Sequence, residues 1–330
     1  AKKPHAHVRE VAVQGAGPTS HIQGAAGALA HVQKLDPGFS LESNGLGQLG
    51  SELQDAFEGL LEYDESRLVC RRCSGPKERG ALARVDISQH FKRVTAGMAV
   101  GSVRRLLHRV KTRWNCRAVW EKRRPRRKPE FTLVRKPFRA KGQRCWSFDD
   151  LLKMTEWTNA MVVSRCGQHL LVRVRGQPMG LSISPVKSGI ACCEAERRGW
   201  STKAKARALG FLKDGEEVQQ VVNGRRIADD ATLCSKVLCG ECIVAFAQKM
   251  VYRKRLPVEP EELGAEISVA DLSLKVRELD NGQLHLDVWK KNKNDDWCIG
   301  AAPRPPRVRY EPALGYQTTR QICSWMICRF

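Results

Sequence analysis

Two adjacent carboxylates, Asp229 and Asp230, lie between two short runs that could each form a strand, within residues 226–233 of this 330-residue chain. Two acids side by side in an apolar frame are costly to bury, because their charges repel one another and lose water. They need either a turn that is open to solvent or a bound cation. The stretch therefore predicts a hairpin with two acids at its tip, and every other segment is interpreted around it.

A third acid, Asp86, stands near the end of another predicted strand. Residues 81–88 form a short strand in this interpretation, and Phe91 follows Asp86 by five positions. The next apolar residues have the spacing of one face of a helix, and they are Val103, Leu106, Leu107 and Val110. A strand that presents an acid, followed by a helix that packs against it, predicts an α/β or α+β unit with the acid at the edge of a sheet.

A glycine-bounded loop over residues 176–185 is predicted to run into a helix. Ser184 is a plausible N-cap, and Pro185 would occupy the first helical position. Such loops place backbone N–H groups and a helix N-terminus where an anionic group or a sugar can approach. Because this loop lies in the chain between the two acid-bearing strands, we expect it to belong to the same site.

The chain begins at Ala1, so we expect a fragment or a processed form. Residues 1–52 are rich in Gly, Ala, Gln and His, with little periodicity, and we expect a poorly ordered lead-in there. Leu53, Phe57 and Leu60 then predict an acidic helix that ends near Leu61.

After the acid pair, a helix is predicted over residues 237–250. Two alternating runs within residues 272–288 then flank Asn281 and Gly282, which predicts a hairpin with a type I′ turn. Residues 289–330 are basic and contain proline, and a short apolar helix is expected near their end.

The charge balance indicates a polyanionic partner. Lys and Arg number 57 against 35 Asp and Glu, which gives a net charge of +22. This excess is larger than solubility requires, so nucleic acid is the first expectation and an anionic membrane surface the weaker one. No run of about 18 apolar residues could span a bilayer, and no secretory signal is evident. We therefore expect an intracellular protein.

Residues 104–144 are the most basic part of the chain, and Trp114 and Trp120 lie among the charges. A charge run is often only a solvated surface. This one is internal, dense and mixed with aromatic residues, so we expect contact with a nucleic-acid backbone. The candidate phosphate-binding residues are Arg123, Arg124, Arg126, Arg127 and Lys128.

Another acid pair, Asp149 and Asp150, has a simpler explanation. Ser147 precedes Asp150 by three positions, and apolar residues follow. This spacing resembles a capping box with Asp in place of Glu, so these acids are predicted to start a helix and not to take part in catalysis.

The 13 cysteines are scattered, and we expect them to be mostly reduced. Two pairs have CxxC spacing: Cys70 with Cys73, and Cys239 with Cys242. A shared zinc site needs four ligands brought together. Because the pairs lie far apart in the sequence, buried or incidental thiols are the favoured interpretation, with a zinc site as the alternative.

The order of these motifs resembles the palm of a reverse transcriptase over about residues 80–300. The loop sequence Pro178-Met179-Gly180 is similar to that of Penelope-like and other non-viral retroelements. The resemblance implies an α+β fold, in which an antiparallel sheet backed by helices forms the palm, with partial fingers and a truncated thumb. The implied divisions are an acidic helix with partial fingers at 53–79, the palm at 80–275 with a basic insertion at 104–144, and a hairpin with the start of the thumb at 276–330.

The resemblance also implies roles for individual residues. Asp86 and Asp229 would hold two Mg²⁺ ions, with Mn²⁺ as a possible substitute, and Asp230 would be the second acid of the catalytic pair. Phe91 would screen the sugar 2′-position. The residues that match the loop positioning template and nucleotide are Gly176, Pro178, Met179, Gly180, Ser184 and Pro185.

Such an enzyme would be an RNA-directed DNA polymerase of a retroelement, with an RNA template, a DNA primer and dNTPs as partners. Carboxylates suit Mg²⁺, and two ions about 4 Å apart can assist phosphoryl transfer. Ile227 stands where the family usually has Tyr or Phe, which motivates an alternative: a catalytically inactive, reverse-transcriptase-derived protein that binds nucleic acid. A third interpretation, a basic structural protein, would leave Asp86 and Asp229 far apart.

Overall fold

The computed structural model describes most of residues 19–290. The contacts divide the chain into two units, Ala1–Val288 and Trp289–Phe330, and the elements below belong to the first unit apart from the last two residues of the final strand. The predicted start of a thumb and the apolar helix predicted beyond residue 290 therefore lie outside the described residues. Within 19–290 it also leaves out 37, 63–67, 124–127, 140–142, 161–162, 167–168, 173–175, 179–180 and 271.

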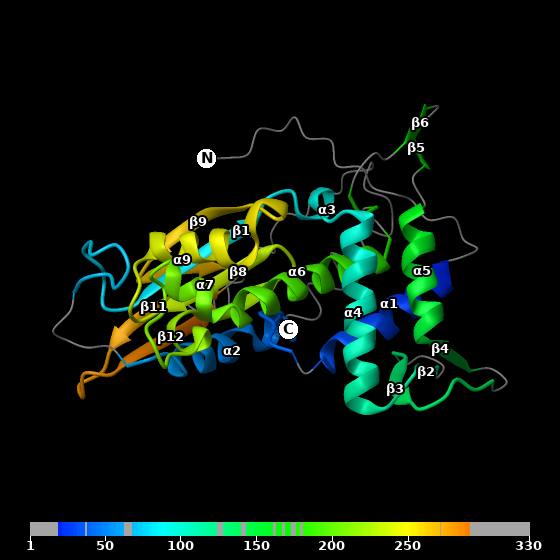
Figure 1. The fold of residues 1–330 in the computed structure, drawn as a ribbon, viewed down its shortest axis with the longest axis horizontal. Helices are drawn as coiled ribbons and strands as arrows, with labels where there is room; N and C mark the ends of the chain where they lie inside the picture. Colours follow the sequence, from blue (N-terminus) through cyan, green and yellow to red (C-terminus); the bar gives the residue numbers. More distant parts are fainter. Residues whose placement is uncertain are drawn as a thin grey trace, which may run out of the picture. The chain divides into compact units, whose positions relative to one another are not determined.

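An antiparallel sheet of four strands contains the predicted acid-bearing segments (Figure 1). Its strands, in spatial order, are β7 (Asn223–Ile227), β8 (Asp230–Ser235), β1 (Ala81–Ile87) and β9 (Val258–Gly264). The strand predicted at 81–88 and the hairpin around the acid pair are thus confirmed. β1 pairs with β8 from Ala81 opposite Ser235 to Asp86 opposite Asp230.

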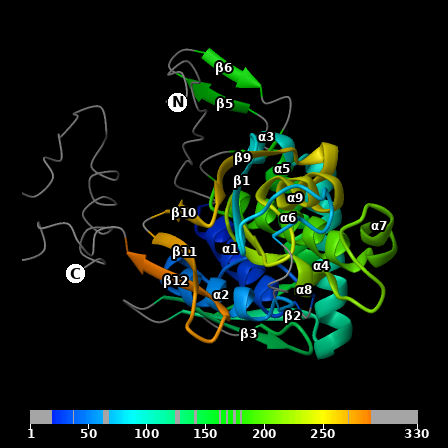
Figure 2. The same ribbon diagram turned by 90° about the vertical axis from the view of Figure 1, so that its left-hand side faces the viewer.

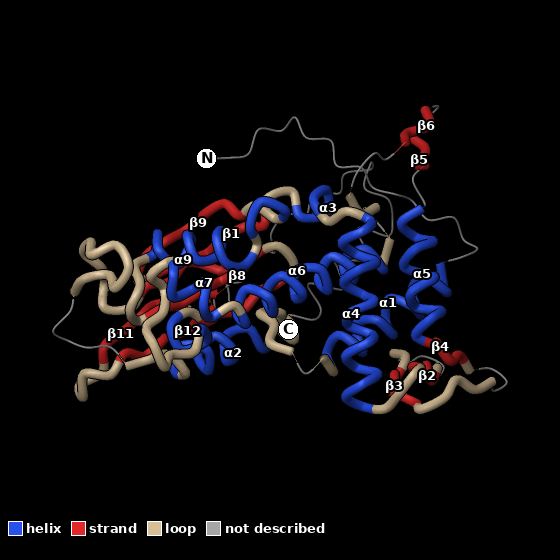
Figure 3. Tube along the Cα trace, in the orientation of Figure 1, coloured by secondary structure: helices blue, strands red, loops and turns tan. Residues whose placement is uncertain are grey.

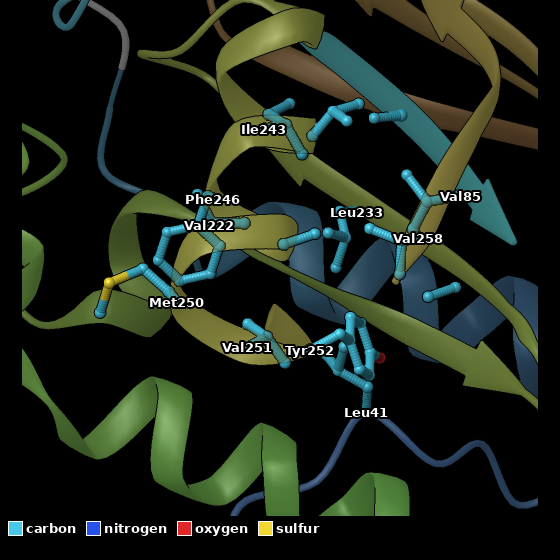
Figure 4. Close-up of a cluster of buried hydrophobic side chains, with 14 of the residues drawn as sticks. Leu41, Val85, Val222, Leu233, Ile243, Phe246, Met250, Val251, Tyr252 and Val258 are labelled. Carbon is cyan, nitrogen blue, oxygen red and sulfur yellow. The ribbon is translucent and has the colours of Figure 1, made fainter. Parts of the chain in front are cut away.

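Helices cover one face of this sheet. They are α6 (Ile183–Ser201) and α9 (Gly240–Phe246), which continues as a π-helical turn, η1 (Ala247–Val251). Figure 4 shows Val85 of β1 and Leu233 of β8 in one buried cluster with Phe246 of α9. Because side chains alternate along a strand, Asp86 and Asp230 lie on the opposite face from this cluster. The α+β fold, with an antiparallel sheet backed by helices, is as predicted.

A second antiparallel sheet and one helix meet the other face (Figure 2). Its strands are β10 (Glu266–Val269), β11 (Leu272–Glu278) and β12 (Leu284–Lys290). Helix α2 (Leu46–Glu58) packs there through Leu53 and Phe57, which share a buried cluster with Leu82 of β1. The helix predicted up to Leu61 therefore forms, although it begins earlier and ends at Glu58.

The hairpin of β11 and β12 is confirmed, but its predicted type I′ turn is wrong. The N–H of Gly282 donates to the carbonyl of Leu279 at 2.9 Å, and the N–H of Leu279 donates to the carbonyl of Gln283, also at 2.9 Å. The N–H of Gln283 donates to Oδ1 of Asn281 at 3.0 Å. Within the turn the positive φ falls on Gly282, at +79°, and not on Asn281. This is a three-residue loop with glycine in the left-handed position, so Asn281 needs no left-handed backbone.

A third group of elements packs around its own buried cluster (Figure 3). Helix α4 (Ala96–Trp114) confirms the helix predicted around Val103 and Val110, and Thr95 caps it by accepting from the N–H of Met98 at 3.2 Å. The other members are α1 (Thr19–Lys34), α5 (Phe148–Ala160), β2 (Ala118–Lys122), β3 (Glu130–Val134) and β4 (Arg144–Ser147).

The expected low order of residues 1–52 is wrong from residue 19 onward, because α1 and most of α2 lie there. Helix α1 packs through Ile22, Leu29 and Val32 together with several small residues. A Cβ on Gly24 would lie 2.7 Å from an oxygen of Glu121, and one on Gly27 would lie 2.4 Å from the ring of Phe131. Because Gly and Ala occupy much of this face, its contrast in hydropathy with the exposed face is small, and its burial is hard to see in the sequence.

The capping box at the start of α5 is confirmed. The N–H of Asp150 donates to Oγ of Ser147 at 3.0 Å, and the N–H of Ser147 donates to a carboxylate oxygen of Asp150 at 3.2 Å. These two bonds satisfy groups that a helix N-terminus would otherwise leave unpaired. The pair Asp149 and Asp150 therefore has the structural role that the sequence predicted.

The two CxxC pairs, which lie far apart in the sequence, come together in the structure. Cys70 and Cys73 come shortly before β1, whereas Cys239 and Cys242 come shortly after β8. Since β1 and β8 are antiparallel neighbours, the start of one strand lies beside the end of the other. Strand pairing thus brings together four thiols that are distant in the sequence.

The remaining described elements are short. They are α3 (His90–Arg93), β5 (Val163–Cys166), β6 (His169–Val172), α7 (Lys203–Ala208), α8 (Val218–Val221) and η2 (Arg253–Arg255). Among the helices in the described ranges, none combines the length and the apolar character that crossing a membrane requires.

Candidate carboxylate site

Asp86 and Asp230 face each other across neighbouring strands. They are register partners at the end of β1 and the start of β8, and both are half-buried. Since Val85 and Ala231 point into the helix-covered core, the two acids share the other face. The interpretation of the chain as a structural protein with separated acids does not fit this pairing.

Asp229 lies in the two-residue turn that joins β7 to β8. Ile227 pairs with Asp230, so Ala228 and Asp229 form the tip. The carbonyl of Asp229 accepts from the N–H of Ile87 at 2.9 Å, which ties the tip to the end of β1. Ala228 has φ of +54°, whereas Asp229 does not have positive φ. A positive φ at only the first central position is the pattern of a type II′ turn.

Substitution of Ala228 should expose the strain in this turn. Ala228 is exposed, so its left-handed backbone, and not its packing, sets the effect. A β-branched residue is much worse than Ala in this region, and Gly is better. We expect Ala228→Val to lower the free energy of unfolding by about 1–3 kcal/mol, with Ala228→Gly no less stable than the parent. Urea denaturation of the three proteins measures this order, and an equally stable Val variant would contradict it.

The turn rests on a buried cation that the sequence analysis did not identify. Arg226 of β7 is fully buried. Its Nη1 donates to the carbonyl of Ala228 at 2.6 Å, its Nε pairs with Glu196 of α6 at 2.5 Å, and Nη2 pairs with Glu42. Burial alone would lower the pKa of Arg226, but these two carboxylates hold it well above its ordinary value. Tyr252 completes the network by donating to Glu196 at 2.8 Å.

His90 is a second buried group near the acids. Its Nε2 lies 3.1 Å from the sulfur of Cys192 on α6. Burial and then the charge of Arg226 lower the pKa of His90, the charge of Asp229 opposes them, and the net result is a pKa of about 4. The imidazole is therefore neutral near pH 7, and it adds no positive charge beside the carboxylates.

Arg84 is the charged neighbour on the acid-bearing face. One Nη2 atom lies 2.6 Å from Glu261 of β9 and 3.8 Å from Asp230, and Nη1 donates to the carbonyl of Ser268 at 2.9 Å. The guanidinium thus offsets part of the negative charge at Asp230.

The three acids are of the chemical type that a hard cation binds. Asp86, Asp229 and Asp230 supply carboxylate oxygens at the end of two strands, partly open to solvent, which is what Mg²⁺ or Mn²⁺ takes from proteins. No thiol lies among these donors. Among the described residues, the set of ligands that closes to within 4.8 Å is a group of cysteines elsewhere, so the three acids form a more open arrangement.

The predicted glycine loop packs against the segment that follows Asp86. Gly176 has φ of +83°, and a Cβ there would lie 2.5 Å from the carbonyl oxygen of Phe91. The N–H of Gln177 donates to that same carbonyl at 2.7 Å, and its side chain donates to the carbonyl of Val94 at 3.1 Å. The loop therefore meets α3, which carries the half-buried Phe91. Pro178 is buried, and Met179 and Gly180 lie outside the described residues.

Gln177 is a positioning residue that the sequence analysis missed. It is almost fully buried, and its two bonds to α3 fix the loop relative to β1. The only signal in the sequence is its place between Gly176 and Pro178, in a loop that had been interpreted through its glycines.

Gly176→Ala should displace this loop. The new Cβ would meet backbone atoms, which cannot rotate away, and φ of +83° is unfavourable for alanine. We expect a loss of about 2–4 kcal/mol in the free energy of unfolding, or a displaced loop with greater protease sensitivity. Gly97→Ala is a matched control, because its Cβ would meet no atom within 4 Å. Equal stability of the two variants in urea denaturation would contradict this account.

The predicted N-cap at Ser184 is wrong by two positions. Helix α6 begins at Ile183 and Ser182 occupies the N-cap position, where its side chain makes no capping bond. The hydroxyl of Ser184 is buried, with no hydrogen-bond partner among the described residues. Pro185 falls within the first turn, where a missing N–H costs nothing, because the first helical N–H groups have no intrahelical partner.

Several arginines of the basic segment are paired within the protein, since Arg105 and Arg109 each contact the buried Glu194. Arg123 donates to the buried Glu121, so part of its charge is used within the protein, whereas Lys128 is exposed. Arg124, Arg126 and Arg127 lie outside the described residues. A cavity of about 570 Å³ lies between β4 and α5, and its lining includes Phe138, Arg139, Arg144, Trp146, Lys153 and Trp157. This mixture of aromatic and basic side chains suits a nucleic-acid strand.

No protein-family model and no curated protein matches the sequence. Among solved structures, the chain is similar to apo telomerase from Candida tropicalis truncated from its C-terminal domain, with 14% identity, 82% of this chain and 45% of that chain covered, and a TM-score of 0.45. It is also similar to Candida tropicalis telomerase in complex with the TWJ fragment of telomeric RNA (14% identity, 92% and 40% covered, TM-score 0.44) and to the corresponding Candida albicans complex (13%, 77% and 38%, 0.43). The chain spans less than half the length of these structures.

Proposed function

We propose that this chain is an RNA-directed DNA polymerase of a non-viral retroelement. One observation carries the proposal: Asp86 and Asp230 pair at the same end and on the same face of antiparallel strands, with Asp229 in the connecting turn. Polymerases that transfer nucleotides need carboxylates on neighbouring rigid elements, because positioning and charge stabilisation do most of the work in phosphoryl transfer.

In this proposal Asp86 and Asp229 hold Mg²⁺ or Mn²⁺. When bound, such ions supply charge stabilisation for the attacking 3′-oxygen and the leaving pyrophosphate. The chain's own residues position the reactants. The bond from Ile87 to Asp229 and the bond from Arg226 to Ala228 hold the acidic tip against β1. Asp230, beside Arg84, completes the acidic group.

The nucleotide would enter beside the loop that packs on α3. Phe91 stands five residues after Asp86, and Gly176 and Gln177 contact its carbonyl group. These contacts tie the loop to the segment that follows the acid-bearing strand. Discrimination at the 2′-position is the role proposed for this side chain, and template positioning is the role proposed for the loop and Ser184.

The RNA template and DNA primer would bind through charge. The excess of 57 basic over 35 acidic residues gives a binding term that does not depend on sequence, and base pairing supplies the choice of nucleotide. Lys128 and the cavity lined by Arg139 and Trp157 are the described candidates for backbone contact and base stacking.

Primer extension tests the proposal. The purified chain, an RNA template with an annealed DNA primer, dNTPs and Mg²⁺ or Mn²⁺ should give elongated primer, and a chelator should stop elongation. A folded preparation that binds the hybrid but incorporates no nucleotide with either ion would refute it.

An inactive nucleic-acid-binding protein is the second candidate. Arg84 places a guanidinium 3.8 Å from Asp230, beside the donors that a metal would need, and Ile227 packs against the apolar cluster of the second sheet. In this case the affinity for an RNA–DNA hybrid would be the same with and without divalent ions, and no primer would be extended.

A further inference from the structure

Four cysteine side chains form a compact group at the end of the sheet remote from the acids. The sulfurs of Cys70, Cys73, Cys239 and Cys242 all lie within 4.8 Å of one another, and three of these residues are buried. The sulfurs of Cys73 and Cys239 are 3.8 Å apart, and no disulfide joins any of the four. A disulfide would bring two sulfurs to about 2.05 Å.

This spacing matches a tetrahedral metal site. With Zn–S bonds of about 2.3 Å, the sulfurs at the corners of a tetrahedron lie about 3.8 Å apart. We propose that Cys70, Cys73, Cys239 and Cys242 together bind one structural zinc ion. Two CxxC pairs with four thiolate ligands are a common form of closed zinc site, in which no position remains for water or substrate.

The segment before β1 is folded in a way that presents two thiols to one point. The N–H of Cys70 donates to the carbonyl of Gly75 at 2.8 Å, and the N–H of Ser74 donates to the carbonyl of Cys70 at 2.9 Å. Ser74 has φ of +56°, which closes the turn. Such a turn lets residues i and i+3 of a CxxC pair reach the same ion. This turn at residues 70–75, here called the knuckle, buries few apolar side chains of its own. The ion would therefore supply the cross-link that holds it in place.

The second pair comes from the turn after β8 and the first turn of α9. Cys239 is the N-cap residue of α9, and its N–H points at the sulfur of Cys70 at 3.3 Å. Arg72 places Nη1 3.6 Å from the sulfur of Cys242. Four thiolates around Zn²⁺ carry a net charge of −2, so a backbone N–H and a guanidinium aimed at the sulfurs are the outer partners that such a site requires.

The ion would join two segments that are far apart in the sequence. The knuckle already contacts the end of β8, because the N–H of Arg71 donates to the carbonyl of Val237 at 3.1 Å. The cysteines lie at the Ala81 end of β1, and Asp86 lies five positions further along that strand. At about 3.3 Å per residue, the cysteines are therefore about 17 Å or more from the acids. The zinc would therefore support the sheet and take no part in catalysis. This inference does not depend on the proposed polymerase activity.

Metal analysis of the full chain tests the inference. We expect protein purified under reducing conditions to contain one zinc ion per chain by mass spectrometry of the metal. Replacement of zinc by Co²⁺ should produce the visible absorption of a tetrahedral tetrathiolate complex. Removal of zinc by a chelator should lower the melting temperature by at least about 5 °C.

Variants separate the cluster from incidental binding. Cys73→Ser and Cys242→Ser should each lower the zinc content at least five-fold, whereas Cys145→Ser, a cysteine of β4 outside the group, should retain it. If a cluster variant fails to fold, thiol counting on the parent protein decides: zinc should protect four thiols from a maleimide, and chelation should expose them. The inference would be overturned if the parent protein bound no zinc when zinc was supplied. It would also be overturned if Cys145→Ser lowered the zinc content as much as Cys73→Ser and Cys242→Ser do.

Discussion

Asp229→Asn should lower primer extension by at least about 100-fold without unfolding the protein. Asn keeps the size of the side chain and removes the charge that a divalent ion needs. The backbone carbonyl of Asp229, and not its carboxylate, makes the bond that fixes the turn to Ile87, so the hairpin should survive the change. We expect Asp86→Asn to act alike, because Asp86 is the acid on the adjoining strand.

The control for this experiment is built into the chain. Asp149→Asn changes the other acid of the second pair, which is exposed in the first turn of helix α5. Loss of its charge near the helix N-terminus costs about 1 kcal/mol of stability or less and should leave extension unchanged. Equal extension by Asp229→Asn and the parent protein would remove the acids from the mechanism. Equal loss in Asp149→Asn would show that the assay reports folding.

Arg226→Met should lower the free energy of unfolding by about 3–5 kcal/mol. The substitution leaves Glu196 fully buried without its cationic partner and removes the hydrogen bond to the carbonyl of Ala228. A buried carboxylate without a partner is far more costly than a lost surface pair, because it no longer has a charge to replace water. Urea denaturation followed by circular dichroism measures the loss.

Two further variants identify the cause. Arg277→Met breaks a pair with Asp287 on exposed strands, so it should cost no more than about 1 kcal/mol. Adding Glu196→Gln to Arg226→Met should restore part of the stability, since the unpaired charge disappears. If the double variant is as unstable as the sum of the two single variants, the loss comes from packing and not from the buried charge.

Several features could be predicted because their signal is local. The strand at Ala81–Ile87, helix α4 and the capping box of Ser147 and Asp150 each depend on residues a few positions apart. Helix α1 escaped prediction because Gly and Ala occupy much of its buried face, which gives the apolar residues Ile22, Leu29 and Val32 little contrast in hydropathy. The predicted type I′ turn was wrong because the loop around Asn281 contains three residues, whereas a type I′ hairpin loop contains two.

The candidate site divides in the same way. The acids were identified from their neighbours in the sequence, but Arg226 and Gln177 were not, because their roles depend on Glu196 and on the Phe91 carbonyl, which belong to distant segments. A charged residue in a strand gives no local sign that it will be buried with a partner.

The sequence by itself determined that strands flank the acid pair, that helix α4 follows β1 and that acids stand at strand ends, because alternation and turns act over a few residues. Only the tertiary structure decided which ends meet. The antiparallel pairing of β1 with β8 places Asp86 opposite Asp230 at one end and brings Cys70 close to Cys239 at the other. Both sites follow from one register, and a register is set by the packing of whole sheet faces, which no short stretch of sequence contains.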